Sequence, residues 1–198
     1  MWRNSPGKGS YQASGKSFKR RNCQESEKQK RSFKGLCQNF QMIQIRFDEG
    51  FQSLINEKRI RNILKDFLNR LFDSQRGISV FITNDAEIQK LNKQFRNKDY
   101  STDILSWPYD LGEGEIAGPD LNESQKKDIA GELAVSAERI SKQASENGWD
   151  FETELIRLLA HGCAHLAGWD HEESEKQERE MLELEIQLLK DVGLKNIY

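Results

Sequence analysis

Residues 151–171 of the chain read FETELIRLLAHGCAHLAGWDH. Its apolar residues recur at helical spacing and cover most of a helix circumference. Its polar residues lie along one line, at steps of three and four: Glu154, Arg157, His161 and His165. Such a pattern is typical of a helix that is buried except for one line facing a cleft. The sequence therefore predicts a central helix over about 151–167.

All three histidines of the chain, His161, His165 and His171, fall in this stretch. His161 and His165 are four residues apart on a helix, so both imidazoles project from one face, close enough to share an ion. Gly168 can adopt a left-handed conformation that ends the helix and lets the chain return His171 to the same point. Three neutral imidazoles leave one position of a zinc ion open to water. The spacing predicts one catalytic Zn²⁺ per chain, although another divalent metal suits the same ligands.

Two neighbours of the histidines need separate interpretations. Cys163 lies about 200° around the helix from His161, which predicts a core residue and not a ligand. Asp170 either orients a ligand imidazole or caps the turn, and the sequence does not separate these roles. The simplest alternative for the histidines themselves is that they lie on a solvent-exposed face.

The spacing His-x-x-x-His-x-x-Gly-x-x-His also matches the metzincin metalloproteases. Those enzymes need Glu directly after the first His as a general base, and this chain has Gly162 there. A zinc metallopeptidase is therefore an alternative that Gly162 disfavours.

The rest of the chain predicts an α+β fold, with a small mixed four-stranded sheet surrounded by about five helices and the histidine helix in the centre. Strands are expected near 42–47, 78–83, 102–107 and 129–135, and a long loop over 108–127. Helices are expected near 56–72, 85–95, 136–147, 151–167 and 173–192.

Composition indicates a soluble protein. The chain has 198 residues, 36% hydrophobic and 31% charged, and its mean hydropathy is -0.81. No apolar run approaches the roughly 20 residues that span a bilayer, and no secretory signal follows the first basic residues. The three cysteines Cys23, Cys37 and Cys163 cannot form a closed set of pairs. These features predict a cytoplasmic protein without a membrane partner.

Residues 1–40 differ in charge from the rest of the chain. They carry ten Lys and Arg against two acidic residues, whereas residues 41–198 carry 20 basic and 30 acidic residues. The first segment lacks an apolar period, so we expect a disordered basic extension before a single domain over 41–198. It is an electrostatic tail, a targeting peptide, or an extension upstream of a start at Met42.

Two blocks resemble the YbeY family of bacterial rRNA maturation factors. Residues 161–171, HGCAHLAGWDH, look like the family pattern H-G-x-x-H-L-x-G-y-D-H. Residues 91–108, LNKQFRNKDYSTDILSWP, resemble its L-N-x-x-y-R-x-K-D-x-x-T-D-V-L-S-F-P block. A weaker block at 130–133 departs from the family because Glu132 replaces the usual Asp. The resemblance covers about residues 42–192.

This resemblance implies a single-strand-specific, metal-dependent endoribonuclease of small-subunit (16S) rRNA 3′ end maturation and ribosome quality control. Its partners would be single-stranded RNA, the ribosome and assembly factors, with no DNA. By position, His161, His165 and His171 are the metal ligands, and Arg96 and His161 are the catalytic residues. A noncatalytic ribosome-assembly factor with structural zinc is a further alternative.

Weaker substrate-binding candidates are Lys98, Thr102 and Ser106. Lys98 is equally well explained as an exposed lysine, and Thr102 and Ser106 as residues of a turn and a strand edge. Residues 41–198 carry a net charge of -10, so RNA binding by this part must be local or assisted by a partner.

Overall fold

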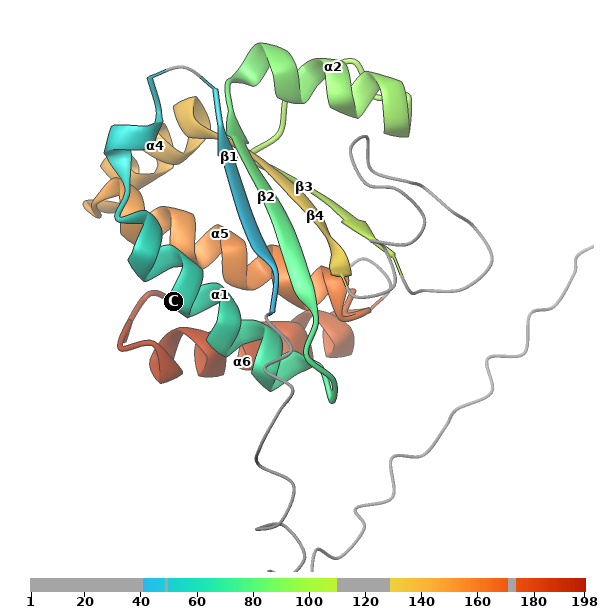
Figure 1. Cartoon of the computed structure of the whole chain (residues 1–198), viewed down its shortest axis with the longest axis vertical. Coiled ribbons are helices and arrows are strands. Elements are labelled where there is room, and N and C mark those ends of the chain that lie inside the picture. The colour runs from blue at the N-terminus through green and yellow to red at the C-terminus, as the bar shows by residue number, and fades with distance from the viewer. Residues whose placement is uncertain (1–40, 49, 110–128, 171–173) are drawn as a thin grey trace, which may run out of the picture. The chain divides into compact units, whose positions relative to one another are not determined.

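A mixed four-stranded sheet, in the order β1-β2-β4-β3, organises the residues that the structure describes. The structure is a computed structural model, and it describes residues 41–48, 50–109, 129–170 and 174–198 (Figure 1). The strands are β1 (Ile43–Phe47), β2 (Gly77–Thr83), β3 (Ile104–Pro108) and β4 (Ile129–Ser136). β1, β2 and β4 run parallel, and β3 pairs antiparallel with β4 as an edge strand.

The register fixes which side chains of β3 reach each face of the sheet. Leu105 pairs with Ala134 and Ser106 with Leu133. Leu105 and Ala134 belong to a small apolar cluster, whereas Leu133 belongs to the main core. Because side chains alternate along a strand, Ser106 lies on the main-core face.

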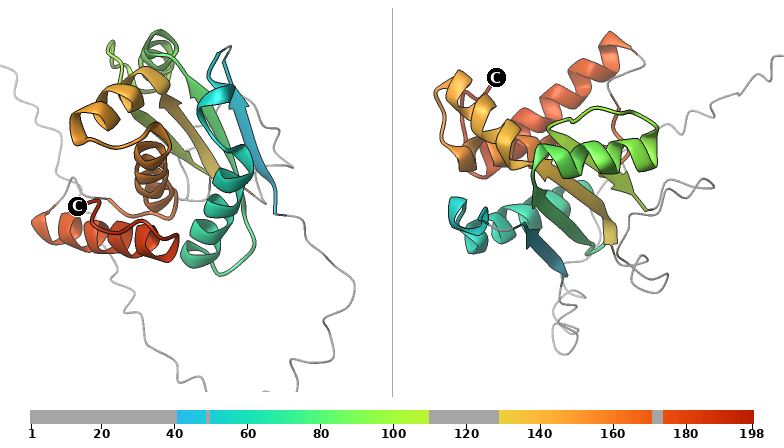
Figure 2. Two further views of the ribbon diagram at one scale, coloured as in Figure 1. Left: turned by 90° about the vertical axis from the view of Figure 1, so that its left-hand side faces the viewer. Right: turned by 90° about the horizontal axis from the view of Figure 1, so that it is seen from above.

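Helices pack on both faces of the sheet. α2 (Asp85–Arg96) packs Ile88 and Leu91 into the small cluster with Leu105. The other helices that the structure describes are α1 (Glu57–Leu71), α4 (Ala137–Asn147), α5 (Phe151–Leu166) and α6 (Glu175–Asp191), with a 3₁₀ turn η1 (Gln52–Leu54). Within the described residues, α5 contacts α1, α4, α6, β3 and β4, and Figure 2 shows it among these helices beside the sheet. The histidine helix is therefore central, as predicted.

Local sequence explains where the helices begin. Each of these five α-helices starts after a residue whose side chain accepts a hydrogen bond from a backbone N–H three residues further on. These N-cap residues are Asn56, Asn84, Ser136, Asp150 and Ser174. Short polar side chains satisfy the first N–H groups of a helix, which otherwise lack an intrahelical partner.

The predicted α+β fold, the four strands and the five helices are confirmed within the described residues. The third strand differs: it begins at Ile104 and includes Pro108, which pairs with Gly131. An edge strand accommodates proline because one side of it makes no ladder bonds. The predicted extension over 1–40, most of the predicted loop over 108–127 and His171 lie outside the described residues.

The main core contains buried side chains from three strands and from α1, α4, α5 and α6. From α5 alone it takes Leu155, Ile156, Leu158, Leu159 and further apolar residues. No helix in the described ranges is both long and apolar enough for a membrane span.

Candidate functional site

The C-terminal end of α5 turns sharply at Gly168. This residue has φ of +84°, and its N–H donates to the carbonyl of His165 at 2.9 Å. Trp169 N–H donates to the carbonyl of Ala164 at 3.1 Å. Glycine adopts this left-handed conformation without a Cβ penalty. The predicted role of Gly168 in ending the helix is confirmed, and the turn brings the Trp169 carbonyl back toward the histidines.

His161 and His165 face each other across one turn of α5. Their Nε2 atoms are 3.2 Å apart. His161 Nδ1 lies 2.8 Å from Glu185 Oε1, and His165 Nδ1 lies 2.9 Å from the carbonyl oxygen of Trp169. Both outer partners are acceptors, so each neutral ring carries its proton on Nδ1 and presents a lone pair from Nε2.

This arrangement fits a divalent cation. Two lone pairs at this separation repel each other unless a proton or a cation lies between them. Nitrogen ligands at about 2.0–2.1 Å from a tetrahedral ion are about 3.3 Å apart, close to the observed separation. Within the described residues no group of three or more His, Cys, Asp or Glu side chains forms a site. His171 lies outside those residues, so the third ligand stays a prediction.

Glu185 on α6 holds the outer side of the His161 ring. Its side chain is 6% exposed, and it also accepts a hydrogen bond from the Tyr198 hydroxyl. Burial alone would raise the pKa of Glu185, but the hydrogen bonds from His161 and Tyr198 outweigh burial and lower this pKa. Glu185 is therefore a carboxylate at neutral pH, and it favours the Nδ1-protonated form of His161.

His161 and His165 line a cleft of about 360 Å³. Its walls come from α2, the segment before β3, β3 itself, and α5 with the turn after it. Its lining residues are Arg96, Thr102, Asp103, Ile104, Ser106, Pro108, His161, His165, Gly168, Trp169 and Asp170. The fold thus brings one block of sequence, around residue 100, against another around residue 165.

Arg96 reaches the cleft from the last residue of α2. Asn97, the next residue, is left-handed with φ of 56° and ends the helix. Arg96 is exposed, and among the described residues its guanidinium has no hydrogen-bond or ion-pair partner. An exposed guanidinium on the wall of a cleft is available to a phosphate.

The segment between α2 and β3 is held by internal hydrogen bonds. Buried Asn92 donates to the carbonyl of Tyr100 at 2.8 Å. Asp103 accepts from Thr102 Oγ1 at 3.1 Å, from Ile104 N–H at 2.9 Å and from Gln143 Nε2 at 3.1 Å. Partial burial raises the pKa of Asp103, but these hydrogen bonds together lower it. Asp103 therefore stays ionised and orders the cleft wall that carries Thr102.

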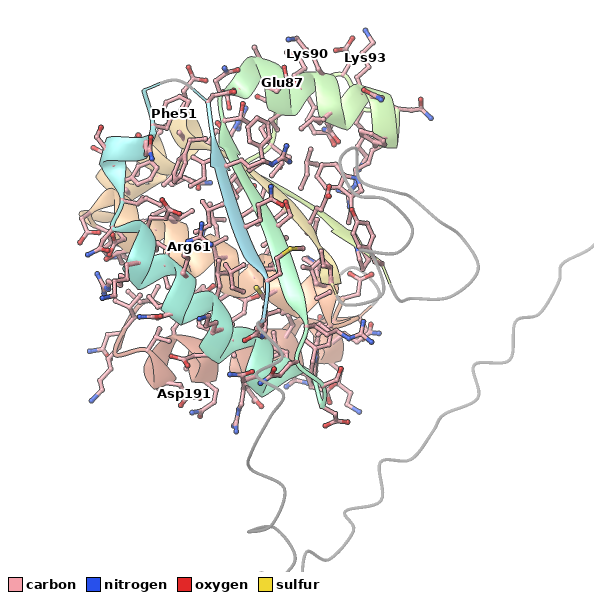
Figure 3. The ribbon with its side chains drawn as sticks, in the orientation of Figure 1. Phe51, Arg61, Glu87, Lys90, Lys93 and Asp191 are labelled. Atoms are coloured by element: carbon pink, nitrogen blue, oxygen red, sulfur yellow. The ribbon has the colours of Figure 1, made fainter. Side chains whose placement is uncertain are left out.

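The lysines near Arg96 lie elsewhere. Lys98 is exposed and is not among the residues that line the cleft, so its substrate-binding role stays a prediction. Lys93 pairs with Asp99 at 2.7 Å. Figure 3 shows Lys90 and Lys93 pointing outward from α2.

One expectation about the polar line of α5 is wrong. Its N-terminal half does not face the cleft, because Glu154 is fully buried and pairs with Arg157 at 2.6 Å. Only His161 and His165 of this line reach the cleft. A fully buried carboxylate needs a paired cation, and Arg157 supplies it within the helix.

Gly162 and Cys163 face the interior. A Cβ on Gly162 would lie 2.7 Å from Ile104 Cδ1 and 2.8 Å from Leu133 Cδ2. The position that carries the general base in metzincins is therefore a close packing point here. Cys163 is fully buried in the main core, as predicted, and burial raises its thiol pKa to about 12.

Sequence reasoning missed the groups that orient the imidazoles. Glu185 had a detectable signal, because it lies on the buried stripe of α6 with Met181, Leu188 and Leu189, where an apolar residue is expected. The Trp169 carbonyl and the Tyr198 hydroxyl had no detectable signal in the sequence. The first depends on backbone geometry, and the second on how the C-terminal residues fold back.

The fold and the site together define an α+β protein in which two facing imidazoles and an arginine border one cleft. The model of the "Endoribonuclease YbeY" family matches residues 44–193. The chain belongs to the YbeY family.

Similar proteins agree with this assignment. An "Endoribonuclease YbeY" of Persephonella marina is 33% identical over 138 residues, covering 70% of this chain and 84% of that protein. One of Petrotoga mobilis is 36% identical over 142 residues, covering 69% and 89%. The solution structure of TM1509 from Thermotoga maritima superimposes with a TM-score of 0.52 at 29% identity, covering 76% of this chain and 89% of that chain.

Proposed function

We propose that this chain is a metal-dependent endoribonuclease that cleaves single-stranded RNA in the cytoplasm. The observation that carries the proposal is the shared cleft: Arg96 and the facing Nε2 atoms of His161 and His165 border one space. A phosphodiester in this space would lie between a fixed positive charge and the ligands of a divalent cation. The names of the similar proteins support RNA as the substrate.

The residues of the chain would divide the work as follows. His161, His165 and His171 hold the metal, which when bound neutralises phosphate charge and lowers the pKa of water. Arg96 binds non-bridging phosphate oxygens through its planar guanidinium. The Ser106 hydroxyl, which lines the same cleft, would donate to a ribose or phosphate oxygen. Asp103 holds Thr102 and the segment before β3 in place.

The physiological substrate that we propose is small-subunit rRNA near its 3′ end, in ribosome maturation and quality control. Residues 41–198 carry net negative charge, which opposes binding to a polyanion away from the cleft. Ribosomal partners that present the strand would offset this repulsion. We therefore expect weak binding to isolated RNA and faster cleavage in ribosomal particles.

The test compares cleavage of one RNA sequence as a single strand and as a duplex, by the full chain loaded with zinc. We expect cleavage of the single strand, its loss on chelation, and a decrease of about 100-fold in Arg96→Ala, because a positioned charge on the reacting group is lost. Arg179→Ala is the matched control, since Arg179 is an exposed arginine on α6. Equal cleavage of strand and duplex, or full activity in Arg96→Ala, would contradict the proposal.

A second arm tests the substrate. A 3′ precursor fragment of small-subunit rRNA, alone and within small-subunit particles, is compared with an unrelated single strand of equal length. Preferential cleavage of the precursor in particles supports the rRNA assignment. Equal rates on all three substrates would reject it while leaving the endoribonuclease proposal intact.

A further inference from the structure

We propose that Glu185 and Tyr198 are positioning residues that hold His161 in its metal-binding form. The inference rests on the proposed metal site and concerns residues that the histidine motif does not contain. Glu185 lies on α6, and Tyr198 lies beyond the residues matched by the family model. Together they fix which nitrogen of His161 carries the proton and where the other nitrogen points.

Glu185 uses both of its carboxylate oxygens. Oε1 lies 2.8 Å from His161 Nδ1, and Oε2 accepts from the Tyr198 hydroxyl. The side chain is nearly buried on the apolar stripe of α6, between Met181 and Leu188. A carboxylate with two fixed partners and little water around it has few alternative rotamers. The His161 ring is therefore held from behind.

Tyr198 is itself supported by Arg157, which pairs with Glu154 in the N-terminal half of α5. The Arg157 guanidinium carbon lies 6.0 Å from the centre of the Tyr198 ring, within reach of a cation–π interaction. Arg157 is fixed in turn by three hydrogen bonds to buried Glu154, at 2.6, 3.0 and 3.2 Å. A continuous set of contacts thus runs from Glu154 through Arg157, Tyr198 and Glu185 to His161.

The two imidazoles are oriented by different means, which makes the inference testable. His165 Nδ1 faces a backbone carbonyl, and substitution cannot remove that acceptor. His161 Nδ1 faces a side chain, and substitution can. Acidic or carbonyl partners of metal-binding histidines raise ligand basicity, and their loss typically weakens metal affinity by about 10–100-fold. Loss of Glu185 should act on His161 alone.

The experiment uses the full chain with three substitutions. Glu185→Gln removes the charge but keeps the shape, and Tyr198→Phe removes only the hydroxyl. Glu183→Gln is the matched control, because Glu183 is exposed on the same helix. The ¹⁵N shifts of the imidazole nitrogens in metal-free protein report the tautomer of His161. Competition with a chromophoric chelator reports zinc affinity, and thermal melting of metal-free protein reports stability.

We expect His161 protonated on Nδ1 in the wild type and a mixture of tautomers in Glu185→Gln. Zinc affinity should fall about tenfold in Glu185→Gln, less in Tyr198→Phe, and less than twofold in Glu183→Gln. Unchanged tautomer and affinity in Glu185→Gln would overturn the inference. A lower melting temperature with unchanged zinc affinity would also overturn it, because the pair would then only stabilise the fold.

The same data separate this inference from the proposed function. If the wild type binds no zinc, the metal-dependent function fails, whereas the spectra of metal-free protein still decide whether Glu185 sets the tautomer. If the wild type binds zinc and cleaves RNA while the variants match it, the positioning inference fails and the function stands.

Discussion

The polar side chains at the two ends of the line on α5 differ in what they contact: one pair is buried, and the other lines the cleft. At the N-terminal end, Glu154 and Arg157 neutralise each other in the interior. At the C-terminal end, the outer nitrogens of His161 and His165 face acceptors, and their Nε2 atoms meet in the cleft. A uniform polar pattern in the sequence therefore contains two different pairs. The closed pair, Glu154 and Arg157, stabilises the fold. The open pair, His161 and His165, suits a cation. The following substitutions separate these two roles.

The largest effect is expected at the closed end. Arg157→Met leaves Glu154, which is fully buried, without its cation and should lower the free energy of unfolding by about 3 kcal/mol. The measurement is urea unfolding of the metal-free protein. Glu154→Leu combined with Arg157→Met removes both charges and should recover most of the loss. A loss below about 1 kcal/mol in the single variant would indicate that the pair is solvated.

The next effect is metal-linked stabilisation at the open end. Zinc at about 100 times its dissociation constant should raise the free energy of unfolding of the wild type by about 2.7 kcal/mol. His165→Ala should lose this gain, because one of the two facing nitrogens is absent, yet keep the stability of the metal-free protein. Lys176→Ala, at an exposed position on α6, should retain the gain. Equal stabilisation of His165→Ala would place the metal elsewhere.

Much of this comparison could be predicted from the sequence, because helical periodicity identifies the polar line directly. The central helix, its end at Gly168, and the buried position of Cys163 follow from spacing alone. The pairing of Glu154 with Arg157 could not be predicted with the same certainty, since a polar line looks the same whether it meets water or itself. The orienting contact of Glu185 depends on how α6 packs against α5, which local sequence does not specify.

The assembly of the cleft also depends on non-local packing that local sequence does not specify. The family motifs place Arg96 and the histidines in separate blocks, and only the antiparallel pairing of β3 with β4 brings Ser106 and its neighbours beside α5. Non-local pairing of this kind has no local sequence signal.

A smaller effect is expected between the two ends, at Gly162. Gly162→Ala places a Cβ within 3 Å of Ile104 and Leu133 side-chain ends and should lower the free energy of unfolding by about 1 kcal/mol. Both contacted atoms are ends of flexible side chains, so the helix should survive. Unfolding in urea checks the value, and a gain in stability would show that the site has spare room.

The smallest effect is expected at Cys163, on the core side of the same turn. A thiol with its pKa raised to about 12 stays protonated at neutral pH, and the thiolate is the form that binds metal. Cys163→Ala should therefore change zinc affinity by less than twofold in chelator competition. A tenfold loss would mean that the thiol takes part in the site.

The proposed metal site has one cation shared by the Nε2 atoms of His161 and His165. Anomalous diffraction at the zinc edge from crystals of the zinc-loaded chain tests it most directly. We expect a single strong peak at about 2.0–2.1 Å from both Nε2 atoms, with the cleft and Arg96 on its open side. A peak away from these two nitrogens, or none at full zinc loading, would contradict it.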